Sequence, residues 1–187
     1  MSQVKEEHYK KDYDSMMRFI SYYHQIDSIR KLKPKTVLEI GIGNKTVSDY
    51  LKRRGIKIST CDFDKNLKPD HVADVRKLPF KDNSFDIVMA CEVLEHLPFK
   101  DLNIALNELR RVTKKYVIIS VPYSQIYINL SLTLPFMKNV FKKELLNLFL
   151  CIRSFTKIKF DGEHYWEIGR LNYSLRKVRK KIERYFN

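Results

Sequence analysis

The chain has 187 residues, 44% of them hydrophobic and 31% charged, which fits one soluble globular domain with a single core. Its 36 Lys and Arg residues against 22 Asp and Glu residues give a net charge of +14. That charge favours anionic partners such as nucleic acid, acidic lipid surfaces or phosphorylated metabolites, although a solvated basic surface explains it equally well. The three cysteines form no Cys-x-x-Cys pair, so we expect no metal site, no disulfide framework and a cytoplasmic location.

Two segments bear on membranes. Residues 1–14 are polar and lack the apolar run of a signal peptide. The longest apolar-rich stretch, 126–150, is interrupted by Pro135 and several charged residues, so we expect no transmembrane segment. This stretch could instead lie on an anionic membrane surface, but packing as part of a lid explains it more simply.

Residues 1–33 are predicted to form an N-terminal helical cap. The cap contains an amphipathic helix at about 14–31, whose recurring apolar residues are Met16, Phe19, Ile20, Tyr23 and Ile26.

The segment 35–122 alternates short apolar strands with amphipathic helices. The expected strands are 36–40, 56–60, 71–74, 85–90 and 116–121. One helix follows the first strand and ends at Gly55, and another spans 102–112 with Asp101 as its N-cap. This alternation predicts an α/β fold with a doubly wound, mostly parallel Rossmann-like sheet and helices on both faces.

Residues 123–172 depart from that rhythm. Apolar residues alternate with period two over 126–134, which is typical of a strand, although a helix is also possible. After Pro135 the apolar spacing predicts a helix through 141–152. We interpret 123–172 as an insertion or lid over the carboxyl edge of the sheet. The last element, within 173–187, is a predicted helix with Leu175, Val178 and Ile182 inward and most of its basic residues outward. The whole chain, 1–187, is then one domain.

The first predicted strand ends in Glu39-x-Gly41-x-Gly43. Glycine permits a tight turn and close approach of a ligand to the backbone, and the next helix begins there with free N–H groups. Asp62 follows the second strand, 21 residues after Gly41, where a carboxylate can accept hydrogen bonds from ribose hydroxyls. The alternative is an ordinary turn residue at a strand end. Ligands of open α/β sheets bind at this edge, so we expect a nucleotide-like site there.

Seven motifs follow one another through this core. They are 37–43 (VLEIGIG), 60–64 (TCDFD), 73–80 (ADVRKLPF), 82–88 (DNSFDIV), 92–97 (EVLEHL), 109–112 (LRRV) and 118–122 (IISVP). In order and spacing they resemble the motifs of the class I S-adenosylmethionine-dependent methyltransferases, in particular the type 11-like group. The resemblance covers about residues 35–122.

The resemblance implies a cofactor, S-adenosylmethionine, with S-adenosylhomocysteine as the product. It places the methionine end of the cofactor beside Glu39, Gly41 and Gly43, and its ribose on Asp62. The remaining assignments are Asp74 to the adenine amino group, Val75 to the ring, and Glu92 and Val93 to the floor beside the sulfonium.

Two departures from the family pattern stand out. Lys45 occupies the position of a third glycine, where it could point outward, crowd the methionine carboxylate or attract it. The C-terminal antiparallel hairpin that completes the family's sheet looks missing or atypical, with 154–160 as the one spare strand. Either the chain is a truncated form or its sheet edge is finished another way. An exposed edge could pair two chains into a homodimer.

Three residues are candidates for catalysis. His96 follows the fourth strand and could act as a general base if the acceptor is a hydroxyl, although a structural role at a helix start is the alternative. His164, in the polar aromatic run 163–167, is the better base candidate, and that run could instead be an anchor of the insertion on the domain. Tyr123 ends the fifth strand beside the expected acceptor pocket.

Several functions remain open at this point. The first is methyl transfer to the oxygen or nitrogen of a small-molecule acceptor, with the insertion at 123–172 and the N-terminal helix forming the lid and pocket. The second is a methyltransferase directed at RNA, which the +14 charge and the basic stretch 176–184 favour. The third is a non-catalytic cofactor-binding or methyltransferase-like protein. A nicotinamide dehydrogenase is disfavoured because Thr46 stands where its fingerprint needs glycine.

Overall fold

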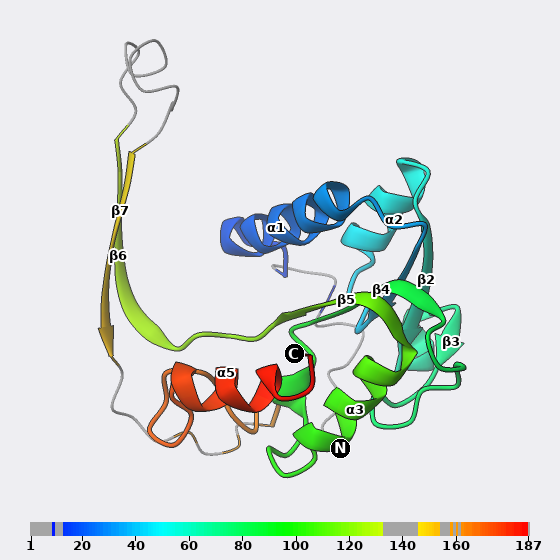
Figure 1. Cartoon of the computed structure of the whole chain (residues 1–187). Coiled ribbons are helices and arrows are strands. Elements are labelled where there is room, and N and C mark those ends of the chain that lie inside the picture. The colour runs from blue at the N-terminus through cyan, green and yellow to red at the C-terminus, as the bar shows by residue number, and fades with distance from the viewer. Residues whose placement is uncertain are drawn as a thin grey trace.

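The computed structural model describes residues 9, 13–132, 146–153, 158, 160 and 162–186. Its centre is a five-stranded sheet in the order β3-β2-β1-β4-β5, and every neighbouring pair is parallel (Figure 1). The strands are β1 (Thr36–Ile40), β2 (Lys57–Asp62), β3 (His71–Val72), β4 (Phe85–Cys91) and β5 (Thr113–Ser120). The predicted doubly wound, parallel α/β core is therefore confirmed.

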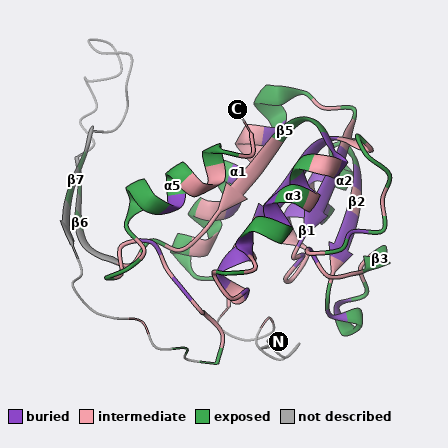
Figure 2. Cartoon of the chain, turned by 60° about the horizontal axis from the view of Figure 1, so that its bottom comes forward, coloured by how far each residue is buried: buried purple, intermediate pink, exposed green. Residues whose placement is uncertain are grey.

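Helices cover both faces of this sheet (Figure 2). The strands alternate their side chains between two cores, one on each face. Val37 and Ile87 face α1 (Met16–Leu32) and α2 (Thr46–Arg53). Leu38 and Val88 face α3 (Leu102–Val112) and α5 (Leu175–Glu183). Two short 3₁₀ helices, η2 (Lys65–Leu67) and η3 (Leu94–His96), follow β2 and β4.

Helix α1 forms where the sequence predicts it, but it packs through a different face. Its buried residues are Tyr22, Gln25 and Ile29. The predicted apolar residues Met16 and Tyr23 are instead 75% and 61% exposed, and Phe19 and Ile20 are exposed too. This helix has apolar residues of its own on all sides, so their spacing alone does not select the face that meets the sheet.

Two details of the other helices also differ from expectation. Asp101 stands at the N-cap of α3 but makes no capping hydrogen bond, because its carboxylate accepts one from Arg76 Nη1 at 2.9 Å. On α5, Val178 is fully buried as predicted, whereas Leu175 is exposed.

A two-stranded antiparallel hairpin follows the sheet and extends away from the body of the molecule (Figure 1). It pairs β6 (Gln125–Leu132) with β7 (Leu146–Arg153). The helix expected through 141–152 is therefore wrong over β7, because its apolar residues pair with β6. Register places Ile128 opposite Leu150 and Leu130 opposite Leu148, and all four side chains are exposed. The described strands of the expected lid thus form an apolar arm.

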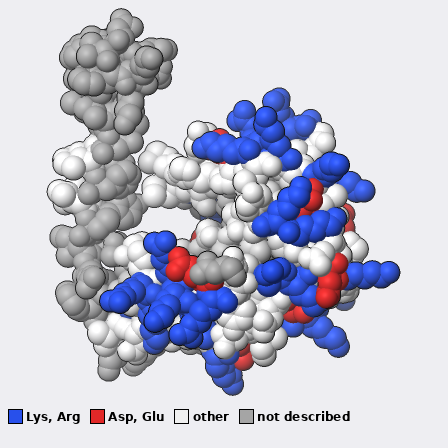
Figure 3. All heavy atoms as spheres, viewed as in Figure 1, with Lys and Arg blue, Asp and Glu red and all other residues white. Residues whose placement is uncertain are grey.

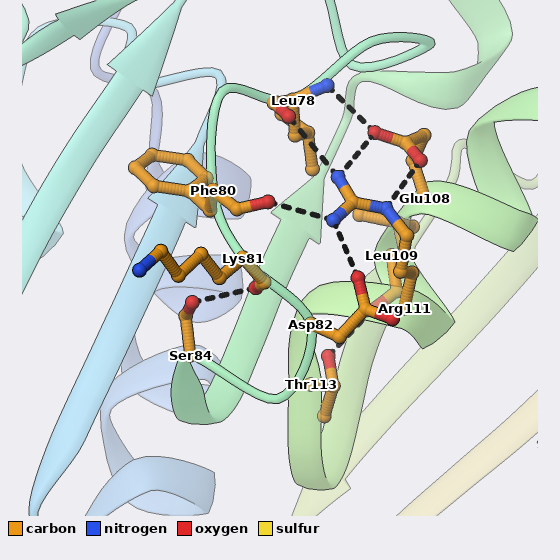
Figure 4. Close-up of polar contacts among 9 residues, drawn as sticks. All are labelled: Leu78, Phe80, Lys81, Asp82, Ser84, Glu108, Leu109, Arg111 and Thr113. Atoms are coloured by element: carbon orange, nitrogen blue, oxygen red, sulfur yellow. Dashed lines mark hydrogen bonds and ion pairs between the residues drawn. The ribbon is translucent and has the colours of Figure 1, made fainter.

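Arg111 ties the loop before β4 to helix α3 (Figure 4). Its guanidinium donates to the Glu108 carboxylate, to Asp82, and to the carbonyl oxygens of Leu78 and Phe80. Glu108 also accepts from the Leu78 N–H at 2.7 Å, which closes the network. This planar fork of donors fixes a loop that has little regular structure of its own.

The sheet ends at β5 among the described residues, and no antiparallel pair continues it there. Of the spare strand expected at 154–160, all but residues 158 and 160 lie outside the described part of the chain. Within the described segments, no helix combines the length and apolar character needed to cross a membrane.

Candidate functional site

A cavity lies at the carboxyl ends of β1, β2 and β4, where the strand order reverses between β1 and β4. Such a switch point is where open α/β sheets bind ligands. All eight residues that the sequence assigned to a cofactor line this one cavity: Glu39, Gly41, Gly43, Asp62, Asp74, Val75, Glu92 and Val93.

The turn after β1 depends on glycine. Gly41 has a φ of +76° and Gly43 a φ of +50°, values that side-chain-bearing residues adopt with difficulty. A Cβ atom on Gly41 would also overlap the side chain of Val93. Backbone conformation and close packing therefore both require glycine at position 41.

Lys45, at the position of the family's third glycine, also has a positive φ, +65°. Its Nζ donates a hydrogen bond of 2.8 Å to the carbonyl oxygen of Lys68. Lys45 is not among the residues that line the cavity. Of the alternatives open in the sequence, the structure thus favours a side chain that points away from the site.

Asp62 holds the glycine turn against the end of β2. Its carboxylate accepts hydrogen bonds of 2.8 Å from the N–H groups of Ile42 and Asp64. Burial raises the pKa of this carboxyl above its ordinary value, although these hydrogen bonds oppose the shift. The carboxylate is therefore held rigidly at the cavity wall.

Glu39 is 5% exposed and belongs to the cavity wall as well. Its Oε2 atom has no hydrogen-bond partner among the residues that the structure describes. Burial raises the pKa of Glu39 to about 7, and hydrogen bonding to Ser48 opposes that shift. A buried oxygen without a hydrogen-bond partner is suited to accept a hydrogen bond from a positively charged donor.

Asp74 also lines the cavity, and it is paired with Arg76. Arg76 donates to it from the main chain and from the guanidinium, with Nη2 at 2.7 Å. Desolvation works against the charged form, but this pairing lowers the pKa of Asp74 overall. The next residue, Val75, is buried and supplies an apolar surface.

Glu92 and Val93 form the wall beyond β4. Glu92 adopts a φ of +56°, and its Oε1 accepts a hydrogen bond of 2.8 Å from Ser120 Oγ. This bond connects the end of β4 to the end of β5. The strained backbone at Glu92 turns the chain toward the cavity.

The N-terminal segment supplies a wall to which the sequence assigned no residues, although the N-terminal helix was expected to help form the pocket. Tyr9, Tyr13, Arg18, Tyr22 and Gln25 all line the cavity. The Arg18 guanidinium lies 4.1 Å from the centre of the Tyr13 ring, a cation–π contact. The resemblance begins at about residue 35, so only the density of tyrosines could have signalled these residues.

The three catalytic candidates occupy different places. His96 lines the cavity, whereas His164 and Tyr123 are not among its lining residues. The rings of His96 and His164 nevertheless meet edge to face, with centroids 4.9 Å apart. Tyr123 forms a parallel bridge with Ile168 and is 47% exposed.

Glu95 is a buried residue of this region that the sequence did not single out. It is fully buried, and neither carboxylate oxygen has a hydrogen-bond partner within the described residues. Burial raises the pKa of its carboxyl well above the ordinary value, and nearby Glu92 adds to this shift. Trp166 is also fully buried and donates to the Leu97 carbonyl at 3.2 Å, which favours the anchor interpretation for that residue of the 163–167 run.

Comparison with known proteins places this site in context. A demethylmenaquinone methyltransferase of Streptomyces avermitilis is 35% identical over 88 residues, 42% of this chain and 37% of that protein. An uncharacterised methyltransferase of Schizosaccharomyces pombe is 47% identical over 58 residues, 31% of this chain and 18% of that protein. The chain spans between 17% and 37% of the length of the curated relatives it matches.

Among solved structures, the PH0226 protein of Pyrococcus horikoshii has a TM-score of 0.49 at 20% identity, over 75% of this chain and 68% of that one. The family model described as a methyltransferase domain matches residues 38–121, the segment from within β1 to just after β5. Over that segment the chain is similar to the methyltransferase-domain family, which confirms the resemblance found in its motifs.

Proposed function

We propose that the cavity binds S-adenosylmethionine and that the protein transfers its methyl group to an oxygen or nitrogen of a small-molecule acceptor. One observation carries this proposal: the eight residues to which the resemblance gives cofactor roles converge on a single cavity. They come from three strand ends and from the loop after β3, so their convergence is a property of the fold.

The residues present fit such a cofactor. Among the described residues, Oε2 of Glu39 has no hydrogen-bond partner. It is therefore suited to accept a hydrogen bond from the ammonium of an amino acid group. Asp62 is held with acceptor capacity at the end of β2, where ribose hydroxyls are recognised. Val75 offers an apolar contact for a base, and the glycine turn after β1 lets a ligand approach the main chain closely.

When bound, the cofactor supplies a methyl group already activated by a positively charged sulfur. The protein's task is therefore to orient the acceptor and to exclude water. His96 lines the cavity and can take the proton of an acceptor hydroxyl, whereas His164 reaches the site only through its contact with His96. Tyr9 and Tyr13 supply aromatic walls from the N-terminal segment.

The test is calorimetric titration of the purified protein with S-adenosylmethionine and, separately, S-adenosylhomocysteine. We expect micromolar binding that Asp62→Ala and Asp74→Asn each weaken at least about tenfold, since each removes a charge-assisted contact. The control is Asp49→Asn, an exposed carboxylate on α2 that does not line the cavity. Absence of binding by a folded wild-type sample would contradict the proposal.

A second candidate function is methyl transfer to RNA, favoured by the basic surface of α5. Arg176, Lys177, Arg179 and Lys180 are all exposed on this helix, and Lys and Arg gather over it in Figure 3. RNA binding through this surface would weaken steeply with salt, and the paired substitution Arg176→Glu and Lys180→Glu would flatten that dependence. Salt-insensitive or absent RNA binding would leave the small-molecule acceptor.

A further inference from the structure

Three potential metal ligands meet beside the cavity. Glu95, His96 and His164 each offer one ligand atom, and these atoms all lie within 4.8 Å of one another. Glu95 and His96 belong to η3, whereas His164 comes from the segment after the hairpin, 68 positions further along the chain. This juxtaposition exists only in the folded protein.

The hydrogen bonds that Nδ1 makes in both histidines indicate Nε2 as the candidate ligand atom of each ring. His96 Nδ1 lies 2.9 Å from the carbonyl oxygen of Glu163, and a carbonyl can only accept, so Nδ1 carries the proton and the ring's lone pair is on Nε2. His164 Nδ1 lies 3.0 Å from Glu167 Oε1, an arrangement that favours the same tautomer. Metal-ligating histidines commonly donate their other N–H to a carbonyl or carboxylate in this way.

Glu95 supplies the second, independent observation. Its side chain is fully buried, yet neither of its oxygens has a hydrogen-bond partner in the described part of the chain. Protonation alone does not resolve this, because a buried hydroxyl also needs an acceptor. A bound cation would supply these buried oxygens with the partner that they lack among the described residues.

We propose that Glu95, His96 and His164 form a binding site for one divalent transition metal ion. Two imidazoles and one carboxylate are a donor set suited to zinc, iron, cobalt or manganese and poorly suited to calcium. Three protein ligands leave coordination positions open. His96 also lines the cavity, so an ion here borders the space that the proposed function gives to the acceptor.

This position suggests a substrate class, an inference that rests on the proposed methyl transfer. A metal ion lowers the pKa of a hydroxyl that binds it, so the proton passes to a solvent base and not to His96, whose Nε2 holds the ion in this arrangement. The resulting oxygen anion then forms the new bond to the methyl carbon as the carbon–sulfur bond breaks. An acceptor with a hydroxyl group able to reach the ion fits this arrangement.

The test is titration of chelator-treated protein with Co²⁺, followed by calorimetry and by visible absorption, without cofactor or acceptor. We expect one equivalent to bind with an absorption spectrum of nitrogen and oxygen ligands. Glu95→Gln and His164→Gln should each lower the affinity about 100-fold or more, and Glu167→Gln about 10- to 100-fold through loss of orientation. His24→Gln, an exposed histidine on α1, should bind as the wild type does.

Circular dichroism and thermal melting establish that each variant is folded before it is titrated. If Glu95→Gln does not fold, His164→Gln decides, because His164 is only partly buried. Failure of the wild type to bind Co²⁺, or unchanged affinity in the folded ligand variants, would overturn the proposal. Titration of Glu95→Gln with S-adenosylmethionine keeps the two proposals apart, since Glu95 does not line the cavity and cofactor affinity should be unchanged.

Discussion

His96 Nδ1 lies 2.9 Å from the main-chain carbonyl oxygen of Glu163, so a residue of the cavity wall is tied to the segment that follows the hairpin. Two further hydrogen bonds make the same connection. Tyr165 N donates to the Glu95 carbonyl at 2.9 Å, and Trp166 Nε1 donates to the Leu97 carbonyl at 3.2 Å. Hydrogen bonds thus fix residues 163–166 against residues 95–97, at the end of η3.

Trp166 should be the main anchor of that segment. We expect Trp166→Phe to lower the free energy of unfolding by about 2 kcal/mol, because it removes buried volume and leaves the Leu97 carbonyl without its donor. Denaturant unfolding measures this, with Tyr116→Phe at a 51% exposed position as the control. Equal stability of the two variants would show that the indole contributes no anchoring energy.

Arg111 should stabilise the loop before β4 far more than its neighbour Arg110 does. Arg111→Ala removes hydrogen bonds to two side chains and two carbonyl groups, so we expect a loss of about 2 kcal/mol after allowance for partial exposure. Arg110→Ala, at an exposed position of the same helix, should change stability by less than about 0.5 kcal/mol. Thermal and denaturant unfolding compare the two, and a similar loss in both would contradict the network's role.

Lys45 holds a left-handed backbone conformation that glycine adopts without steric cost. We expect Lys45→Gly to raise the free energy of unfolding by up to about 1 kcal/mol, the gain being reduced by the greater entropy of the unfolded chain and the lost bond to Lys68. Lys45→Ala keeps the strain while losing that bond, so it should be less stable than the wild type. If Lys45→Gly is the less stable of the two variants, backbone strain at this position is negligible. Cofactor affinity should not change, because the side chain does not line the cavity.

The sequence predicted the sheet correctly and named residues that line one cavity, for a physical reason. Strands buried on both faces are continuous apolar runs, and the polar residues that follow them must meet at one edge of a parallel sheet. Glu39, Asp62 and Glu92 each lie near the carboxyl end of a strand or just after it, so the topology of the sheet alone brings them together.

Features that depend on distant contacts were not predictable in this way. α1 carries apolar residues all around, and its buried face, with Tyr22 and Ile29, is chosen by the sheet beneath it. The run that forms β7 is apolar enough for a helix or a strand, and pairing with β6 decides. The meeting of Glu95 with His164 likewise joins positions that no local pattern relates.

Because of Glu39, the free energy of unfolding should fall as the pH rises from 4.5 to about 7. Burial raises its pKa from 4.5 to about 7 on folding, with Asp49 and Asp62 adding to the shift and Lys52 opposing it. Within that window the folded state keeps a proton that the unfolded state has released. The free energy of unfolding therefore declines with pH, by about 3 kcal/mol across the window, and is level above it.

Glu39→Gln removes this titration. Between pH 4.5 and 7 the free energy of unfolding of the wild type should fall by about 3 kcal/mol relative to that of the variant. Urea unfolding at closely spaced pH values measures this difference. The comparison cancels the other titrating groups, since both proteins contain them. Asn107→Gln, at an exposed position on α3, controls for substitution alone and should keep the wild-type slope. Parallel pH profiles for the wild type and Glu39→Gln would mean that Glu39 is ionised in the folded protein at pH 5. The buried carboxylate would then need more compensating positive charge than Lys52 provides, because Lys52 opposes the pKa shift only in part.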